Sequence, residues 1–298
     1  MRWKGRRQSQ NLDDRRNMRA SAGTGGAGIL MLFRVVPFLL GNKVGRIILV
    51  LGVVVFFGAR FMGIDLLQVA SSPGTLQQPR ELNAQDQEMG DFVAVVLADT
   101  EDIWTTLFTE MGRSYQEPTL VLFRDRVNSA CGSAQSAMGP FYCPGDQQLY
   151  IDLAFFDDME RQLDAPGDFA QAYVIAHEVG HHVQTLLGIS SNVQRARQTA
   201  SGIDANRLSV AQELQADCFA GIWGYYANNT IGVVETGDID EALTAAAAIG
   251  DDRLQQQSQG TVRPETFTHG TSAQRVSWFR QGFDNGVVDQ CDTLIIDR

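Results

Sequence analysis

The stretch Gln171–Gly188, QAYVIAHEVGHHVQTLLG, decides how the rest of this 298-residue chain is organised. It contains the pattern H-E-x-x-H, formed by His177, Glu178 and His181. On an α-helix, residues i and i+4 lie on one face, so both imidazoles can reach a single zinc ion. Glu178 lies one position round the helix, where it can accept a proton from a zinc-bound water.

The predicted helix is apolar on nearly all sides, which is typical of a buried helix. Asp168 can cap its start, and Gly188 stands where a C-terminal glycine commonly ends a helix. Two histidines and a glutamate inside a buried helix need partners, and a metal ion supplies them. The alternative is a pair of core histidines whose hydrogen bonds are satisfied by other protein groups.

The expected third ligand is a carboxylate, because a catalytic zinc has three protein ligands and an open position for water. Of the four histidines in the chain, His182 points about 100° away from His181 round the helix. Glu213 and Asp217 are four residues apart among apolar residues on a helix predicted over 206–228. Two unpaired carboxylates buried there would be costly. We predict Glu213 as the zinc ligand and Asp217 as the acceptor that orients a ligand histidine; the alternative is two solvent-facing acids.

The charge of the chain changes sign along its length. Residues 1–46 carry a net charge of +8, whereas the residues from Arg60 onward carry −19. So acidic a main body argues against nucleic acid as a partner.

An apolar stretch separates these two parts, and it predicts a membrane anchor. We expect a disordered basic cytoplasmic tail over residues 1–41, one transmembrane helix over 42–62 and a linker over 63–90. The positive-inside rule then places the main domain, residues 91–298, on the periplasmic side of the cytoplasmic membrane.

The four cysteines all follow the predicted membrane helix. An even number of cysteines outside the cytoplasm indicates disulfides, for which three pairings are possible. The short loop favours Cys131 with Cys143, which leaves Cys218 with Cys291; the alternative is four reduced thiols. No C-x-x-C is present, so a cysteine zinc site is not expected.

The main domain is predicted to be α+β, mostly helical with a small sheet. The strand that contains Tyr150 is a candidate edge for an extended peptide to pair with, or it is purely structural. Hydrophobic periodicity predicts strands at 119–123 and 147–152, and further helices at 91–111, 153–164, 190–202, 239–257 and 272–283.

Several segments resemble the bacterial neutral zinc metallopeptidase family. They are MRWKGRRQSQNLDDRR, ACGSAQSAMGPFYCPGDQQLYID, AHEVGHHVQTLLG, ELQADCFAGIW and HGTSAQRVSWF. The pair H-E-x-x-H and E-x-x-A-D also resembles the gluzincin arrangement of thermolysin-like and membrane-bound zinc peptidases. The resemblance runs from end to end, includes one membrane span, and implies a zincin-like fold.

Gluzincins commonly place a basic or hydroxyl donor opposite the zinc, where it stabilises the tetrahedral oxyanion. By this resemblance His269 is the candidate catalytic donor, with Arg275 or a tyrosine as the alternative. A surface or packing role for His269 is equally compatible with the sequence.

These residues predict a membrane-anchored zinc peptidase with one Zn²⁺ per chain and a protein or peptide substrate. His177, His181 and Glu213 would hold the metal, and Glu178 would act as the general base. One alternative is a membrane-anchored binding or scaffold protein with a structural zinc, and another is a zinc hydrolase of cell-wall amide bonds. The placed general base favours an enzyme, because a structural site needs none.

Overall fold

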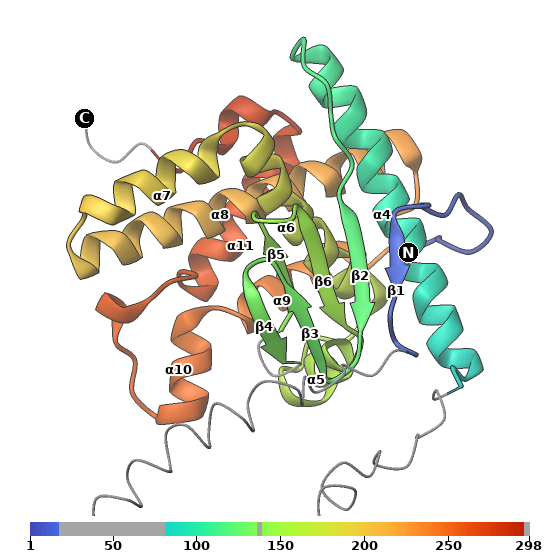
Figure 1. Cartoon of the computed structure of the whole chain (residues 1–298), viewed down its shortest axis with the longest axis horizontal. Helices are drawn as coiled ribbons and strands as arrows, with labels where there is room; N and C mark the ends of the chain where they lie inside the picture. The colour runs from blue at the N-terminus through green and yellow to red at the C-terminus, as the bar shows by residue number, and fades with distance from the viewer. Residues whose placement is uncertain (18–80, 136–138, 295–298) are drawn as a thin grey trace, which may run out of the picture. The chain divides into compact units, whose positions relative to one another are not determined.

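The computed structural model describes residues 1–17, 81–135 and 139–294. These ranges form a mostly helical fold with a small sheet, which confirms the predicted α+β class (Figure 1). Within them, no helix is both long and apolar enough to cross a bilayer. The predicted membrane helix, residues 42–62, and the linker residues 63–80 lie outside the described ranges.

The main sheet has four strands in the order β1-β2-β6-β5. Strands β1, β2 and β6 run parallel, and β5 pairs antiparallel with β6. Tyr150 lies in β6, between β2 and β5, so its strand is not an edge and that prediction is wrong. The edge strands are β1 and β5, and β5 is too short to show an alternating pattern of its own. The bounds are β1 Leu12–Asp14, β2 Thr119–Phe123, β5 Phe141–Cys143 and β6 Gln148–Asp152; a separate hairpin joins β3 Arg126–Ser129 to β4 Gly132–Gln135.

Eight α-helices occupy the described ranges, close to where periodicity predicts them. They are α4 Ala84–Glu110, α5 Ala154–Gln162, α6 Asp168–Leu186, α7 Ile189–Thr199, α8 Gly202–Tyr226, α9 Asp238–Ala248, α10 Asp251–Gln259 and α11 Ser272–Asn285. Helix α4 begins inside the predicted linker, because Asn83 and Asp86 form a reciprocal capping box there. The folded domain therefore starts before residue 91.

The helix predicted over 239–257 is two helices, α9 and α10, that break at Gly250. A Cβ at this position would lie 2.4 Å from the backbone nitrogen of Ser272, the first residue of α11. Only glycine allows the two chain segments to approach so closely. The break places Asp251 at the start of α10, where it takes part in the site described below.

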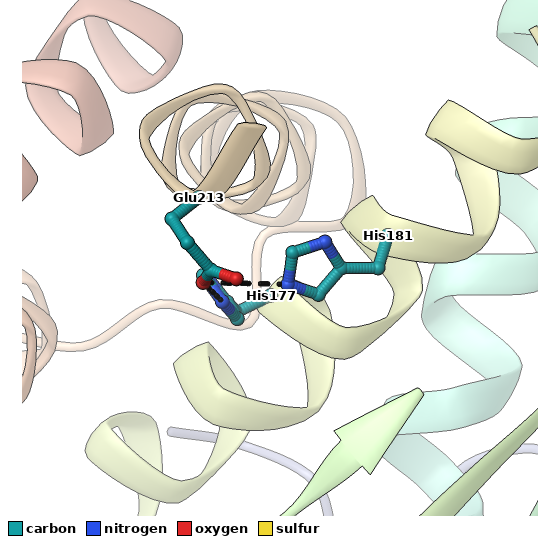
Figure 2. A group of neighbouring side chains, drawn as sticks. All are labelled: His177, His181 and Glu213. Atoms are coloured by element: carbon teal, nitrogen blue, oxygen red, sulfur yellow. Dashed lines mark hydrogen bonds and ion pairs between the residues drawn. The ribbon is translucent and has the colours of Figure 1, made fainter. Parts of the chain in front are cut away.

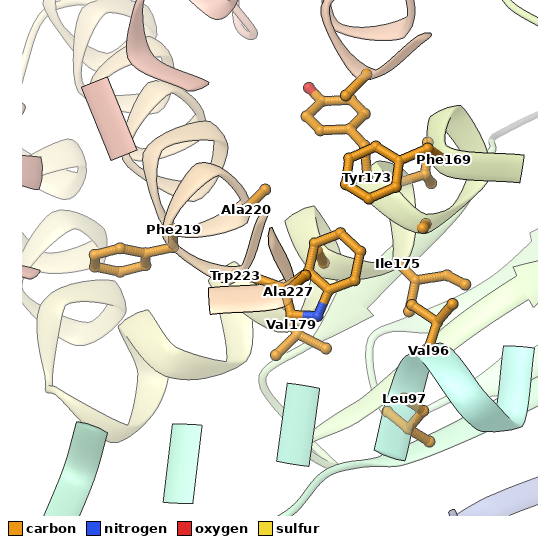
Figure 3. Close-up of a cluster of buried hydrophobic side chains, with 14 of the residues drawn as sticks. Val96, Leu97, Phe169, Tyr173, Ile175, Val179, Phe219, Ala220, Trp223 and Ala227 are labelled. Atoms are coloured by element: carbon orange, nitrogen blue, oxygen red, sulfur yellow. The ribbon is translucent and has the colours of Figure 1, made fainter. Parts of the chain in front are cut away.

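Helix α6, which carries the H-E-x-x-H pattern, packs between α4 and α8 in the hydrophobic core. Figure 3 shows Ile175 of α6 near Val96 of α4, and Phe169 of α6 near Trp223 of α8. The rings of Phe169 and Trp223 stack with their centroids 5.4 Å apart. Both faces of α6 are therefore covered, as its apolar sequence predicts.

The ends of α6 differ in part from the prediction. The N-cap is Gly167, and Asp168 is the first residue of the helix. The carboxylate of Asp168 accepts a hydrogen bond from the amino group of Met1. Gly188 follows the helix in the left-handed conformation, with φ of 79°, as predicted.

Residues 1–17 belong to the folded domain, so the prediction of disorder is wrong for this part of the tail. Strand β1 pairs with β2, and the arginines before it bind acids of α4. Arg6 bonds to Asp99, and Arg7 bonds to Glu101. Asp99 and Glu101 are both only 2 % exposed, so the arginines compensate carboxylates that would otherwise be buried unpaired. The composition of residues 1–17 does not reveal this role of the arginines, because the acids that they bind lie about ninety residues further along the chain.

Both predicted disulfides are confirmed: Cys131 bonds to Cys143, and Cys218 bonds to Cys291. The first closes a short loop that leads into β5. The second ties α8 to the short helical turn Val288–Cys291 near the end of the described chain.

Replacing Cys218 and Cys291 by serine is expected to lower the free energy of unfolding by about 4 kcal/mol. Replacing Cys131 and Cys143 is expected to lower it by about 3 kcal/mol. The order follows from loop length, because the two bonds span 73 and 12 residues and loop-closure entropy grows with that span. Urea unfolding of both double variants measures the free energy of unfolding. A larger loss in the variant without Cys131 and Cys143 would contradict this reasoning.

Candidate metal centre

Three side chains converge on one point between α6 and α8 (Figure 2). The Nε2 atoms of His177 and His181 lie 3.2 Å and 3.4 Å from Oε2 of Glu213. Tetrahedral zinc, with metal–ligand distances of about 2.0–2.2 Å, separates neighbouring ligand atoms by about 3.3 Å. The three predicted ligands can therefore hold one zinc ion, because their ligand atoms all lie within 4.8 Å of one another.

Gly180, inside the H-E-x-x-H pattern, lets α8 come close enough to supply the third ligand. A Cβ on this residue would lie 3.0 Å from the carbonyl oxygen of Ala216, which stands between Glu213 and Asp217 on α8. A larger residue would push the two helices apart at the site.

Each histidine is oriented by a buried acceptor on its other ring nitrogen. Nδ1 of His177 donates to Oδ1 of Asp217 at 2.8 Å, as predicted. Nδ1 of His181 lies 2.9 Å from Oε1 of Gln184, whose amide nitrogen donates to the carbonyl of Gln212. With Nδ1 held by these acceptors, Nε2 is the ring nitrogen of each histidine that faces Glu213 and would bind a metal. Gln184 was missed, although its i+3 spacing from His181 is a usable signal.

Burial raises the pKa of the Glu213 carboxyl, but the imidazoles of His181 and His177 lower it well below its ordinary value. Glu213 is therefore ionised, which is the form that binds zinc.

Arg275 lies behind His177 and holds Asp217 in place. Its Nε donates to Oδ2 of Asp217, and its Nη2 donates to Oδ1, both at 2.9 Å. The hydroxyl of Tyr173 donates to the same Oδ1 at 2.6 Å. Burial raises the pKa of Asp217, yet Arg275 and His177 bring it down to about 2, so this carboxylate stays charged. Arg275 is buried, and its N–H groups also donate to the carbonyl of Ile249 and to the hydroxyl of Tyr173.

Replacing Arg275 by methionine is expected to lower the free energy of unfolding by about 3–5 kcal/mol, because Asp217 would keep a buried charge without its main partner. Chemical denaturation of the metal-free chain measures this loss. Arg280→Met is the matched control, since Arg280 is exposed on the same helix. Equal losses in the free energy of unfolding of the two variants would show that the ion pair of Arg275 with Asp217 does not stabilise the fold more than an exposed arginine does.

Glu178 lies beside the three ligands and has no hydrogen-bonding partner within the described ranges. It is 7 % exposed and faces a cavity of about 600 Å³. Burial raises the pKa of its carboxyl, and the two imidazoles only partly oppose the shift. A free carboxylate with a raised pKa beside a metal position is suited to accept a proton from water.

His269 also lines this cavity, on the segment between α10 and α11. Its Nδ1 lies 3.2 Å from Oδ1 of Asp251, and the other carboxylate oxygen accepts backbone N–H groups from Thr268, His269 and Gly270. Asp251 thus fixes the loop and one ring nitrogen, and Nε2 of His269 forms no hydrogen bond within residues 1–17, 81–135 and 139–294. The sequence did not identify Asp251, because its partner is 18 residues away across a loop.

The chain matches over residues 1–294 the family described as "Putative neutral zinc metallopeptidase". It belongs to this family. It is 52% identical over 296 residues to the uncharacterized protein YpfJ of Escherichia coli (strain K12), covering 99% of each chain. It is 47% identical over 191 residues to the uncharacterized protein Rv2575 of Mycobacterium tuberculosis (strain ATCC 25618 / H37Rv), covering 60% of this chain and 63% of that protein. No solved structure matches the chain.

Membership of the zinc metallopeptidase family confirms the resemblance and implies zinc as the metal. The matched region includes residues 1–17, so the ordered N-terminal segment is part of what the family shares. His182, which the helix geometry excluded as a ligand, lies away from the centre in this member of the family. Its Nε2 donates to the carbonyl of Gln116 at 2.6 Å, and its Nδ1 accepts from the hydroxyl of Tyr142 at 3.1 Å.

Proposed function

We propose that this chain is a zinc-dependent peptidase that holds one Zn²⁺ through His177, His181 and Glu213. The observation that carries the proposal is the convergence of these three ligands at the wall of a cavity, with the free carboxylate of Glu178 beside them. Zinc bound here would lower the pKa of a water molecule and polarise a scissile carbonyl. Glu178 takes a proton from the attacking water and delivers it to the leaving amine.

His269 is the proposed donor to the developing oxyanion. The two tyrosines of the cavity wall, Tyr142 and Tyr173, already donate their hydroxyl groups to His182 and Asp217. Hydrogen bonding to Asp251 raises the pKa of His269, which favours the protonated, donating form of the imidazole. This arrangement supports a role in charge stabilisation.

The substrate backbone is proposed to pair with β5. This strand is an edge of the main sheet, and its residues Phe141 and Tyr142 line the cavity that contains Glu178. Edge strands bind extended peptides through main-chain hydrogen bonds, and the adjoining pocket then receives a side chain.

The open side of the centre favours an enzyme over a scaffold with structural zinc. A closed structural site fills its fourth position with a protein ligand. Among the described residues, the candidate cluster that includes His177 contains three ligand residues and borders a cavity. The two disulfides support a location on the extracytoplasmic side, where such bonds persist.

The function is tested with the purified full chain, loaded with zinc, stripped by chelator and then reloaded. Casein-derived peptides and peptidoglycan fragments serve as parallel substrates. We expect peptide cleavage in the zinc-loaded form, its loss on chelation and its return with zinc. Cleavage of peptidoglycan fragments alone would favour the cell-wall amide hydrolase. Zinc binding without hydrolysis of either substrate would favour the scaffold.

A further inference from the structure

One wall of the cavity carries a cation without a partner in the described parts of the chain. Helices α7 and α8 form this wall with the polar residues Ser190, Arg197, Ser209 and Gln212. Ser190 accepts a hydrogen bond from Gln212 at 3.4 Å, and the hydroxyl of Ser209 donates to the carbonyl of Ala205 at 3.2 Å. Arg197 is exposed, and none of its N–H groups forms a hydrogen bond or ion pair within residues 1–17, 81–135 and 139–294.

The other charged groups around the cavity are already committed. Arg275 is bound to Asp217, and Glu213 lies between the two histidines. Glu178 is the proposed base, and His269 is the proposed donor to the oxyanion. Among the described residues that line the cavity, Arg197 is therefore the cation that remains available. The residues of the chain from Arg60 onward carry a net charge of −19.

We infer that Arg197 binds a carboxylate of the substrate and so selects acidic peptides. The planar guanidinium offers five N–H donors in a fork that matches a carboxylate, and such charge-assisted pairs add both affinity and orientation. The carboxylate comes from an Asp or Glu side chain or from the free C-terminus of the peptide. This inference rests on the proposed function, because it assigns the substrate class of the same cavity.

The competing explanation is that Arg197 only completes the last turn of α7, where a cation interacts favourably with the helix dipole. That role would affect the stability of α7 and leave peptide selection unchanged. A binding measurement separates the two roles.

The test uses the full chain carrying Glu178→Gln, loaded with zinc, so that bound peptides are not cleaved. Fluorescent peptides of one parent sequence, amidated at the C-terminus, carry Glu in place of Gln at each position in turn. A further peptide has Gln throughout and a free C-terminal carboxylate. We expect at least one carboxylate peptide to bind about tenfold more tightly than the neutral parent.

The added variant Arg197→Gln is expected to abolish this difference, and Arg197→Glu is expected to reverse it toward peptides with Lys. Arg195→Gln is the matched control, because Arg195 is exposed on the same helix, bonds to Asn192 and does not line the cavity. It is expected to keep the preference of the parent protein. The two forms of carboxylate peptide then distinguish a side-chain site from a C-terminal site.

Equal binding of acidic and neutral peptides, or a preference that survives Arg197→Gln, would overturn the inference. Because binding is measured without turnover, the result does not depend on peptidase activity. An Arg197-dependent preference in a chain that hydrolyses no peptide would support the carboxylate site and contradict the proposed function. Chelator-sensitive peptide hydrolysis without a preference for carboxylate peptides would support the proposed function and contradict the carboxylate site.

Discussion

Glu178→Gln is expected to leave zinc bound and to reduce peptide hydrolysis by about 10²–10⁴-fold. The amide has the shape of the carboxylate but cannot accept a proton from water. Glu178 does not contribute to the cluster of His177, His181 and Glu213, so metal binding should not change. Metal analysis and kcat/KM for a casein-derived peptide measure the two properties on the same preparation.

Glu160→Gln is the control for this variant, since Glu160 is an exposed glutamate on α5. It is expected to retain wild-type activity. Undiminished cleavage by zinc-loaded Glu178→Gln would show that another group acts as the base.

Glu213→Ala is expected to lower zinc affinity by more than 100-fold, because only His177 and His181 would remain as ligands. Gln184→Leu provides an internal scale. It removes the acceptor that orients His181 and should lower affinity by about 10–100-fold, the range found for groups that support a metal ligand. Competition with a chromophoric chelator measures both constants.

Circular dichroism of the metal-free proteins checks that Glu213→Ala folds normally. If Glu213→Ala bound zinc as tightly as the wild type, Glu213 would not be a zinc ligand. A larger loss of zinc affinity in Gln184→Leu than in Glu213→Ala would contradict the assignment of Glu213 as a ligand and Gln184 as a group that only orients His181.

The features that sequence predicted well depend on short spacings. His177 and His181 share a face because they are four residues apart on one helix, and Glu213 and Asp217 follow the same rule. The strand at 119–123 was predicted to the residue, and the helix that contains the H-E-x-x-H pattern was predicted to within a few residues at each end. Each is an apolar segment bounded by residues that favour an end.

The features that sequence missed depend on contacts between distant segments. Arg275 reaches Asp217 from 58 residues away, and no local pattern marks either as the partner of the other. Tyr150 lies in an inner strand of the sheet because of the order of the strands, and the alternation of polar and apolar residues along a strand does not predict that order. The break at Gly250 follows from the approach of α11 and not from any loss of helical periodicity.

The pairing of β1 with β2 limits how this chain can meet a membrane. Residues 1–17 and 81–294 fold as one body, so both lie on the same side of any bilayer. A single crossing, with the basic end inside the cell and the zinc centre outside, would require β1 to leave the sheet. The pairing therefore predicts that the basic N-terminus and the zinc centre lie on the same side of any membrane that the chain meets.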